Sequence, residues 1–447
     1  MQSLKALFRQ PKSVFLLSFV QMWNRFSHYG MRALLVLFML HALKFSTPFA
    51  LGVYAVFCAL VELGGVLGAY LAQKTFGLRR AILYGGWIVA LGHLSLAMKW
   101  FFPGLALLIV GSSLFSTNIT ALIGEFYQPQ DVRRQGGFTL FYMGINVGAL
   151  LATILCGFLA ENFGWEYGFG LAAAGMVLGN LALLKFRHLL SGKGETPEAP
   201  KKGLPLLLIG LGGFAILCMV GQSISLPLLP ILAVGLGILI FRKLRKQNIP
   251  LKGLALSLVT LVLFFAAEEQ IGSSLVVFTS EKTTHTLFGL PMATSSILSL
   301  NPIVIIFFGA IANALYLKIK NPSRRLAIPF LIVAGALALL SFSHMAIPIL
   351  PLSSVMGVVA LISFAELLVG PMLYTTCSEV SSAAKDPKVM GLVPIGFSLA
   401  ALLGGTMSKF ITATGYDLGF LVVAAMVTLF GIGLGGLQAR IRQVTSA

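Results

Sequence analysis

Residues 13–42 read SVFLLSFVQMWNRFSHYGMRALLVLFMLHA, an apolar run of membrane-spanning length that polar side chains interrupt. These side chains recur every three or four residues, a spacing that places them on one face of a helix. They are Gln21, Asn24, Arg25, His28, Tyr29 and Arg32. An arginine near the centre of a bilayer costs about 3 kcal/mol on insertion scales. A helix tolerates this cost when its polar face lines a water-filled cavity or contacts a buried partner, so the stretch indicates a transport pathway.

The composition of the whole chain is that of an integral membrane protein. Of its 447 residues, 57% are hydrophobic and only 10% are charged, whereas soluble domains carry roughly 25% charged residues. Continuous apolar stretches of about 20 residues, enough to cross a bilayer as a helix, recur along the chain and lack the alternation typical of barrel strands. We therefore expect an all-α multi-pass membrane protein with fourteen transmembrane helices. The expected helices span residues 13–42, 48–72, 80–102, 103–127, 137–160, 167–186, 204–221, 225–241, 251–279, 294–317, 325–347, 352–381, 389–411 and 417–438.

The net charge of +18 would suggest a nucleic-acid partner in a soluble protein, but the basic residues follow a topological pattern. Most of the 32 lysines and arginines lie in the terminal segments and in alternate loops, which places those segments in the cytoplasm by the positive-inside rule. The remaining basic residues are Lys44, Lys99, Lys282 and Lys409 on the outer side, and Arg25 and Arg32 within the membrane. We therefore expect cytoplasmic termini, contact with the lipid bilayer and no nucleic-acid partner.

The chain divides at a basic linker, residues 187–203. Six expected helices precede this linker, two short apolar helices without charged residues follow it, and six more begin near residue 251. Two six-helix bundles around a central site suggest transport by alternating access, in which the bundles rock against each other. The expected domains are an N-terminal bundle (1–190), a linker with two inserted helices (191–245) and a C-terminal bundle (246–447).

The polar stretch of the first helix resembles the E-x-x-E-R-F-x-Y-Y-G-M-R signature of the proton-dependent oligopeptide transporter family of the major facilitator superfamily. It matches this signature at Arg25, Phe26, Tyr29, Gly30, Met31 and Arg32. Further matches are F-Y-x-x-I-N-x-G at 141–148, G-W-x-x-G-F at 164–169, E-Q at 269–270, L-N-P at 300–302 and E-x-x-x-x-P at 366–371. The resemblance implies the major facilitator fold of two six-helix bundles with two extra helices between them, in the bacterial inner (plasma) membrane.

The chain departs from the family at two acidic positions, because Gln21 and Asn24 stand where the signature has glutamates. Amide side chains donate and accept hydrogen bonds but carry no titratable proton, so the family's proton-coupling site on the first helix is absent. In addition, Ser116 replaces a lysine and Gln73 replaces the aspartate of the loop at 68–80. The acids well inside the expected spans are the candidate proton carriers, because a buried carboxylate changes its protonation when a cationic partner comes or goes. They are Glu62, Glu268, Glu269 and Glu366.

The resemblance also implies roles for the charged residues within the membrane. Arg32 is expected to pair with Glu269 as a gate between the bundles, which protonation of Glu269 would loosen. Arg25 lacks its first-helix glutamates and is expected either to pair with Glu62 or, without that partner, to bind an anionic group of the substrate. Static neutralisation of the two arginines by these acids is the alternative to proton coupling.

Other residues are expected to contact the substrate. By the same resemblance, Glu366 would receive a peptide's amino group, and Asn146 and Asn301 would hold its backbone. His28 replaces a family tyrosine, and we expect it to be a neutral, hydrogen-bonded pocket residue. Tyr29 either lines the pocket or packs against neighbouring helices.

The sequence therefore predicts a secondary transporter that moves small peptides or peptide-like solutes as a monomer, coupled to protons through carboxylates outside the first helix. The alternative is an uncoupled facilitator, exchanger or exporter of another, anionic solute. An enzyme is not expected, because the chain has no nucleotide-binding loop and no H-E-x-x-H motif. We expect no metal site and no cofactor, since its four cysteines are scattered through apolar spans.

Overall fold

The structure is a computed structural model that describes residues 10–128, 131, 133–197, 203, 206–245, 251–384 and 392–446. The described part is nearly all helical, and twelve of its helices are long and apolar enough to cross a membrane. The helix with the polar stretch, α2 (Lys12–Leu37), has 26 residues but is too polar to be among the twelve. The helix α8 (Leu206–Val220) is apolar but shorter. The predicted fold class, an all-α multi-pass membrane protein, is confirmed.

The chain divides into two compact units. The first consists of Met1–Phe38 and Leu60–Val220, and the second of Met39–Ala59 and Gly221–Ala447. The helix α3 (Thr47–Leu71) contributes a half to each unit. The predicted domain boundaries near residues 190 and 245 stay a prediction.

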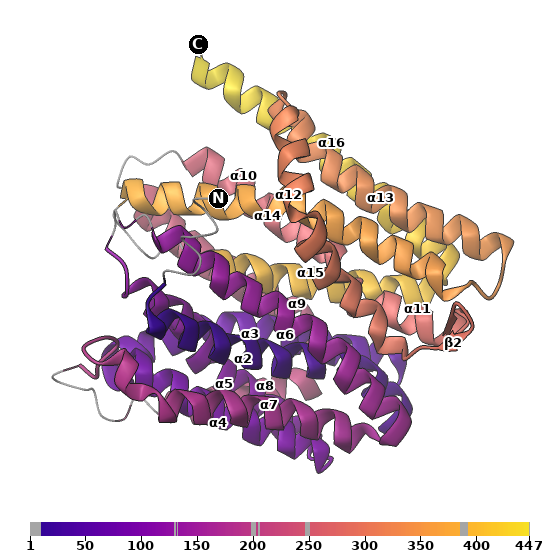
Figure 1. The fold of residues 1–447 in the computed structure, drawn as a ribbon. Coiled ribbons are helices and arrows are strands. Elements are labelled where there is room, and N and C mark those ends of the chain that lie inside the picture. Colours follow the sequence, from indigo (N-terminus) through magenta and orange to yellow (C-terminus); the bar gives the residue numbers. More distant parts are fainter. Residues whose placement is uncertain are drawn as a thin grey trace. The chain divides into compact units, whose positions relative to one another are not determined.

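The first unit is built from helices that follow one another along the chain (Figure 1). Besides α2, α8 and half of α3, its helices are α4 (Leu78–Ala97), α5 (Phe101–Gly124), α6 (Arg133–Phe163) and α7 (Trp165–Lys185). Short helical segments follow three of the helices: η1 (Phe38–Ala42), which belongs to the second unit from Met39 on, η2 (Ala72–Phe76) and η3 (Arg187–Leu190). The main contacts join α4 to α5 and α7, and α2 to α6 and α7.

Two glycines allow these helices to approach closely. A Cβ on Gly68 of α3 would lie 1.8 Å from the carbonyl oxygen of Ser113 on α5. A Cβ on Gly148 of α6 would lie 2.2 Å from the carbonyl oxygen of Met22 on α2. Neither distance is sterically possible, so backbone contact at these points requires glycine, as is common between membrane helices.

Hydrogen bonds outside the membrane spans tie the start of α2 to the connection between α5 and α6. Tyr127 Oη donates to Gln10 Oε1 over 2.6 Å, and Gln10 Nε2 donates to the carbonyl oxygen of Arg133 over 3.2 Å. Burial raises the pKa of Tyr127. The hydrogen bonds from Arg133 hold the pKa of the Asp131 carboxyl below its usual value. This connection is thus fixed by polar contacts where the spans end.

The second unit contains the remaining helices and a small hairpin (Figure 1). Its helices are α9 (Gln222–Arg245), α10 (Leu251–Glu268), α11 (Ser274–Lys282), η4 (Thr294–Ser299), α12 (Leu300–Lys318), α13 (Pro322–Ala346), α14 (Leu352–Ala384), α15 (Leu392–Thr414) and α16 (Tyr416–Ser446). The hairpin pairs β1 (Thr286–Leu287) with β2 (Leu290–Pro291) in antiparallel register. These are the strands of the described chain, and they lie in a connection, outside the apolar spans.

The prediction of one continuous helix over 251–279 is wrong at its centre. The chain leaves the helix after Glu268 and re-enters it at Ser274. The apolar run conceals this break because its composition stays that of a membrane span on both sides. Polar side chains at the break satisfy backbone groups that a broken membrane helix exposes.

Candidate functional site

The helix α2 carries its polar residues and its packing contacts on different sides. Gln21 and Asn24 are buried, with 1% and 4% of their surface exposed, and Arg25, His28, Tyr29 and Arg32 are half-buried. On the packing side, Met22 contacts α6, and Trp23 and Phe26 contact Gly175 of α7. The structure therefore brings the predicted α2 residues together as one polar stripe.

Several polar atoms of this stripe are buried without a protein partner. Within the described chain, Gln21 Oε1, Asn24 Oδ1 and Arg25 Nε have no hydrogen-bond partner. Buried polar groups in proteins are nearly always hydrogen-bonded to protein or to ordered water. The stripe thus presents two acceptors and a cationic donor that suit water or a polar solute.

His28 sits among positive charges and beside a second histidine. It lies within electrostatic range of Arg25, Arg32 and His93, and its ring meets the Tyr29 ring edge-on at 5.3 Å. The expected role of His28 as a neutral, hydrogen-bonded pocket residue stays a prediction.

Two further predicted residues lie on the other helices of the first unit. Asn146 of α6 is buried, and its Nδ2 donates to the carbonyl oxygen of Tyr142 in the same helix over 3.0 Å. Glu62 of α3 is half-buried. The pairing of Glu62 with Arg25 and a substrate contact of Asn146 both stay predictions.

The second unit joins two of the predicted substrate-binding residues directly. Asn301 opens α12, and its Nδ2 donates to Glu366 Oε2 of α14 over 2.7 Å and to Ser363 Oγ over 3.2 Å. Ser363 in turn donates to the carbonyl oxygen of Val359, one turn earlier. The amide thus fixes the Glu366 carboxylate between two helices. A charge-assisted hydrogen bond of this length is strong.

Glu269 lies in the break between α10 and α11, next to a buried amide that anchors the break. Gln270 Nε2 donates to the carbonyl oxygens of Ala266 and Gly404, each over 3.0 Å. Gln270 Oε1 accepts hydrogen bonds from Ser274 Oγ at 2.7 Å and Ser408 Oγ at 2.8 Å. The side chain therefore has all its hydrogen bonds satisfied, and it binds the break to α15.

Glycine at position 404 lets α15 come close enough for this contact. A Cβ on Gly404 would lie 2.7 Å from the Cβ of Glu269 and 2.9 Å from the carbonyl oxygen of Ala266. Ser273 Oγ donates to the carbonyl oxygen of Glu269 over 2.6 Å and lies 2.7 Å from Ser408 Oγ. Glu269 thus belongs to a backbone segment that the hydrogen bonds of Gln270 and Ser273 and the close approach of Gly404 hold in place. Its pairing with Arg32 would join the two units and stays a prediction.

The sequence reasoning missed several polar residues that shape these sites. The anchoring role of Gln270, the serines Ser273 and Ser408, and the buried His93 of α4 were not among the predicted residues. His93 has no exposed surface, and neither ring nitrogen has a hydrogen-bond partner within the described chain. For His93, the signal in the sequence was a lone polar residue in an apolar span. Such a residue more often packs in the core than forms part of a binding site.

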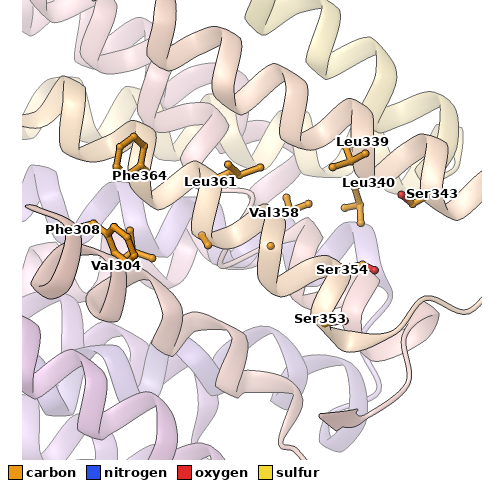
Figure 2. A pocket seen from close by; sticks show the side chains of 12 residues that line it. Val304, Phe308, Leu339, Leu340, Ser343, Ser353, Ser354, Val358, Leu361 and Phe364 are labelled. Carbon is orange, nitrogen blue, oxygen red and sulfur yellow. The ribbon is translucent and has the colours of Figure 1, made fainter. Parts of the chain in front are cut away.

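A groove in the second unit is lined by none of the predicted site residues. It has a volume of about 550 Å³ and opens between α12, α13 and α14. Figure 2 shows Val304 and Phe308 on one side of it and Leu339 and Leu340 on the other. Such an apolar, partly exposed groove suits lipid chains better than a charged solute.

Membrane helices that carry half-buried arginines and carboxylates beside buried amides are typical of multi-pass transporters of polar solutes. Comparison with known proteins identifies its family. Residues 79–197 match the PTR2 profile of the POT family. The uncharacterized transporter YclF of Bacillus subtilis is 31% identical over 377 residues, which cover 77% of this chain and 75% of YclF. The chain belongs to the POT family, as the sequence motifs predicted.

Further relatives and a solved structure agree with this assignment. Dipeptide and tripeptide permease A of Erwinia pyrifoliae is 29% identical over 363 residues, covering 76% of this chain and 72% of the permease. A crystal structure of a peptide transporter POT in complex with sulfate matches 97% of this chain and 96% of its own, with a TM-score of 0.84 and 25% identity. The protein is therefore a membrane transporter with the fold of this family.

Proposed function

We propose that this transporter moves small peptides or peptide-like solutes across the bacterial plasma membrane by alternating access. The dipeptide and tripeptide permeases among its relatives support this substrate class. Both termini would lie in the cytoplasm, as the distribution of basic residues indicates. The working unit would be the monomer, because each chain carries a complete set of the proposed site residues.

The observation that carries the proposal is the hydrogen bond from Asn301 to Glu366. A peptide presents an ammonium group at one end, and a carboxylate held in a fixed position is a specific acceptor for it. The amide of Asn301 can also turn to a peptide carbonyl or N–H, since it carries both a donor and an acceptor. The pair would thus bind the amino end of the substrate.

Arginine on α2 would receive the opposite end of the substrate. Arg25 Nε is buried without a hydrogen-bond partner in the described chain, and a guanidinium binds carboxylates in a planar, bidentate geometry. Its neighbours Gln21 and Asn24 are neutral, so the stripe leaves positive charge for an anionic group. The proposed substrate is thus a zwitterion of short length.

Proton coupling would use the carboxylates outside α2. Glu269 would carry the proton at the break between α10 and α11, and its neutralisation would release Arg32. Glu62 would pair with Arg25 only when no anionic group of the substrate is bound there, and Glu366 would change its proton affinity when a cationic group binds. These assignments follow from the loss of acids at Gln21 and Asn24 together with the acids that remain.

One observation favours the second candidate, an uncoupled carrier of anionic solutes. The polar stripe of α2 contains two arginines and no acid, so a solute with net negative charge would be attracted to it. Such a carrier would not need Glu366 to receive an ammonium group. The affinities for dipeptides and for their N-acetylated forms therefore distinguish a peptide transporter from a carrier of anionic solutes.

The test measures binding of a panel of di- and tripeptides to the purified protein at two pH values. The proposal predicts that dipeptides bind, that N-acetylation weakens them about tenfold or more through loss of a charge-assisted hydrogen bond, and that Glu366→Gln removes this difference. Glu161→Gln, at an exposed carboxylate of α6, is the matched control and should keep it. Equal binding of free and acetylated peptides would contradict the proposal and favour the anionic solute.

A further inference from the structure

The first part of the linker after α7 is bound to the ends of α4 and α5. We name residues 190–196 the linker strap. Arg79, at the start of α4, makes three contacts with it. Its backbone N–H donates to the carbonyl oxygen of Gly194 over 3.1 Å, its Nη1 donates to the carbonyl oxygen of Leu190 over 3.1 Å, and its Nη2 donates to Glu195 Oε1 over 3.1 Å. One arginine thus holds both the backbone and a side chain of the strap.

Two neighbouring elements complete the attachment. Glu125, which follows α5, accepts a hydrogen bond from the backbone N–H of Gly194 over 2.8 Å. Thr196 Oγ1 donates to the carbonyl oxygen of Phe76, in the π-helical turn η2, over 3.2 Å. The strap therefore bridges three separate elements of the first unit.

Two glycines shape the seat of the strap. Gly77 has a φ of +73°, and a Cβ there would lie 2.3 Å from the carbonyl oxygen of Glu195. Gly194 has a φ of +60°, and a Cβ there would lie 2.7 Å from Leu122 Cδ1. Each glycine is required both by its backbone conformation and by close approach of the neighbouring chain. Such a fit indicates a specific attachment of the linker.

The connection between α3 and α4 contains no acid for its arginines. Glu195 supplies one from the linker, 116 residues away in sequence. The pair is partly solvated, with 30% of the Arg79 side chain and 60% of the Glu195 side chain exposed.

We propose that Glu195 is a positioning residue that, through Arg79, latches the linker strap onto the α3–α4 turn and the end of α5. The latched strap keeps these three elements in one rigid body. Since rocking carriers move as rigid bodies, release of the strap would slow the conformational step of transport and leave substrate affinity unchanged. The latch is independent of the substrate, and only this effect on transport rests on the proposed function.

The experiment compares Glu195→Gln with Glu195→Asp and with Glu166→Gln, an exposed carboxylate in the first turn of α7. Limited trypsin cleavage after Lys193, which is exposed within the strap, is followed by mass spectrometry on the full-length protein. Peptide uptake into proteoliposomes and peptide binding are measured on the same samples. Midpoints of thermal unfolding equal to that of the wild-type protein establish that all variants are folded.

The latch predicts that Glu195→Gln speeds cleavage after Lys193 about two- to fivefold, the range expected for an exposed ion pair. It also predicts a lower maximal uptake rate with an unchanged peptide Kd, wild-type behaviour of Glu166→Gln, and recovery in Glu195→Asp. Unchanged cleavage in Glu195→Gln, or equal acceleration in Glu166→Gln, would overturn the latch. If the wild-type protein takes up no peptide, the proposed function fails and the cleavage rates alone decide the latch.

Discussion

Asn301 Nδ2 lies 2.7 Å from Glu366 Oε2, so α12 and α14 meet at a hydrogen-bonded amide and carboxylate. Ser363, one turn before Glu366 on α14, accepts a second hydrogen bond from the same amide at 3.2 Å. The arrangement gives Glu366 a defined position in the second unit. It is the basis of the proposed recognition of a substrate amino group.

Removal of the Asn301 amide should weaken peptide binding even though the Glu366 carboxylate remains. Asn301→Ala is expected to weaken dipeptide binding by about 1–3 kcal/mol, because it leaves the half-buried Glu366 carboxylate without its donor. Isothermal titration with a dipeptide measures the loss. Asn162→Ala, which removes an exposed asparagine whose amide donates to the carbonyl oxygen of Phe158 in its own helix, is the control. Unchanged affinity in Asn301→Ala would mean that Glu366 needs no help from α12.

The break between α10 and α11 should depend on Ser408. Its hydroxyl donates to Gln270 Oε1 and contacts Ser273 Oγ inside the second unit. Ser408→Ala is expected to lower stability by about 1–3 kcal/mol, because buried polar atoms lose their partner. Thermal unfolding in detergent measures this change. Thr414→Ala removes an exposed hydroxyl from the same helix and should leave the midpoint nearly unchanged; an equal drop in both variants would contradict the special role of the break.

Close contact between α3 and α5 should make Gly68 intolerant of any side chain. Gly68→Ala would force the helices apart at Ser113 and is expected to destabilise the protein by about 1–3 kcal/mol, as overpacking does. Gly210→Ala is the matched control, because nothing lies within 4 Å of a Cβ at that helical glycine. It should stabilise slightly, by about 0.5–1 kcal/mol, through helix propensity. Similar unfolding midpoints for the two variants would contradict the packing.

The neutral amides of α2 should determine how strongly transport depends on protons. Replacing both residues, Gln21→Glu with Asn24→Glu, restores two titratable groups beside Arg25 and should steepen the dependence of uptake on an imposed pH gradient. The control is the conservative double variant Gln21→Asn with Asn24→Gln, which keeps an uncharged amide at both positions. Uptake assays in proteoliposomes at several external pH values measure the difference. An unchanged pH dependence would show that the stripe does not contribute to coupling.

The fold and much of the candidate site could be predicted because hydropathy and helical spacing are local properties. The stripe from Gln21 to Arg32 follows from the spacing of its residues. The family motifs pointed to Asn301 and Glu366 separately, whereas their mutual hydrogen bond appears only in the structure. The break at Glu269 could not be predicted from hydropathy, since the run remains apolar on both sides. It depends on Gln270 and its partners on α15, which are far away in sequence.

The other missed features also depend on tertiary contacts. Arg79 and Glu195 are 116 residues apart, and no periodic pattern links two such positions. His93 is a single polar residue in an apolar helix, and the sequence does not show whether such a residue contacts lipid, core or cavity. The burial of its two ring nitrogens is visible only in the structure.

Uptake of a labelled dipeptide into proteoliposomes, with and without an imposed proton gradient, tests proton-coupled peptide transport. We expect accumulation that rises with a gradient directed inward, that Glu366→Gln abolishes, and that Glu161→Gln retains. Uptake that is indifferent to the gradient would contradict coupling through the remaining carboxylates. Absence of dipeptide uptake, with transport of an anionic solute in its place, would contradict the proposed substrate class.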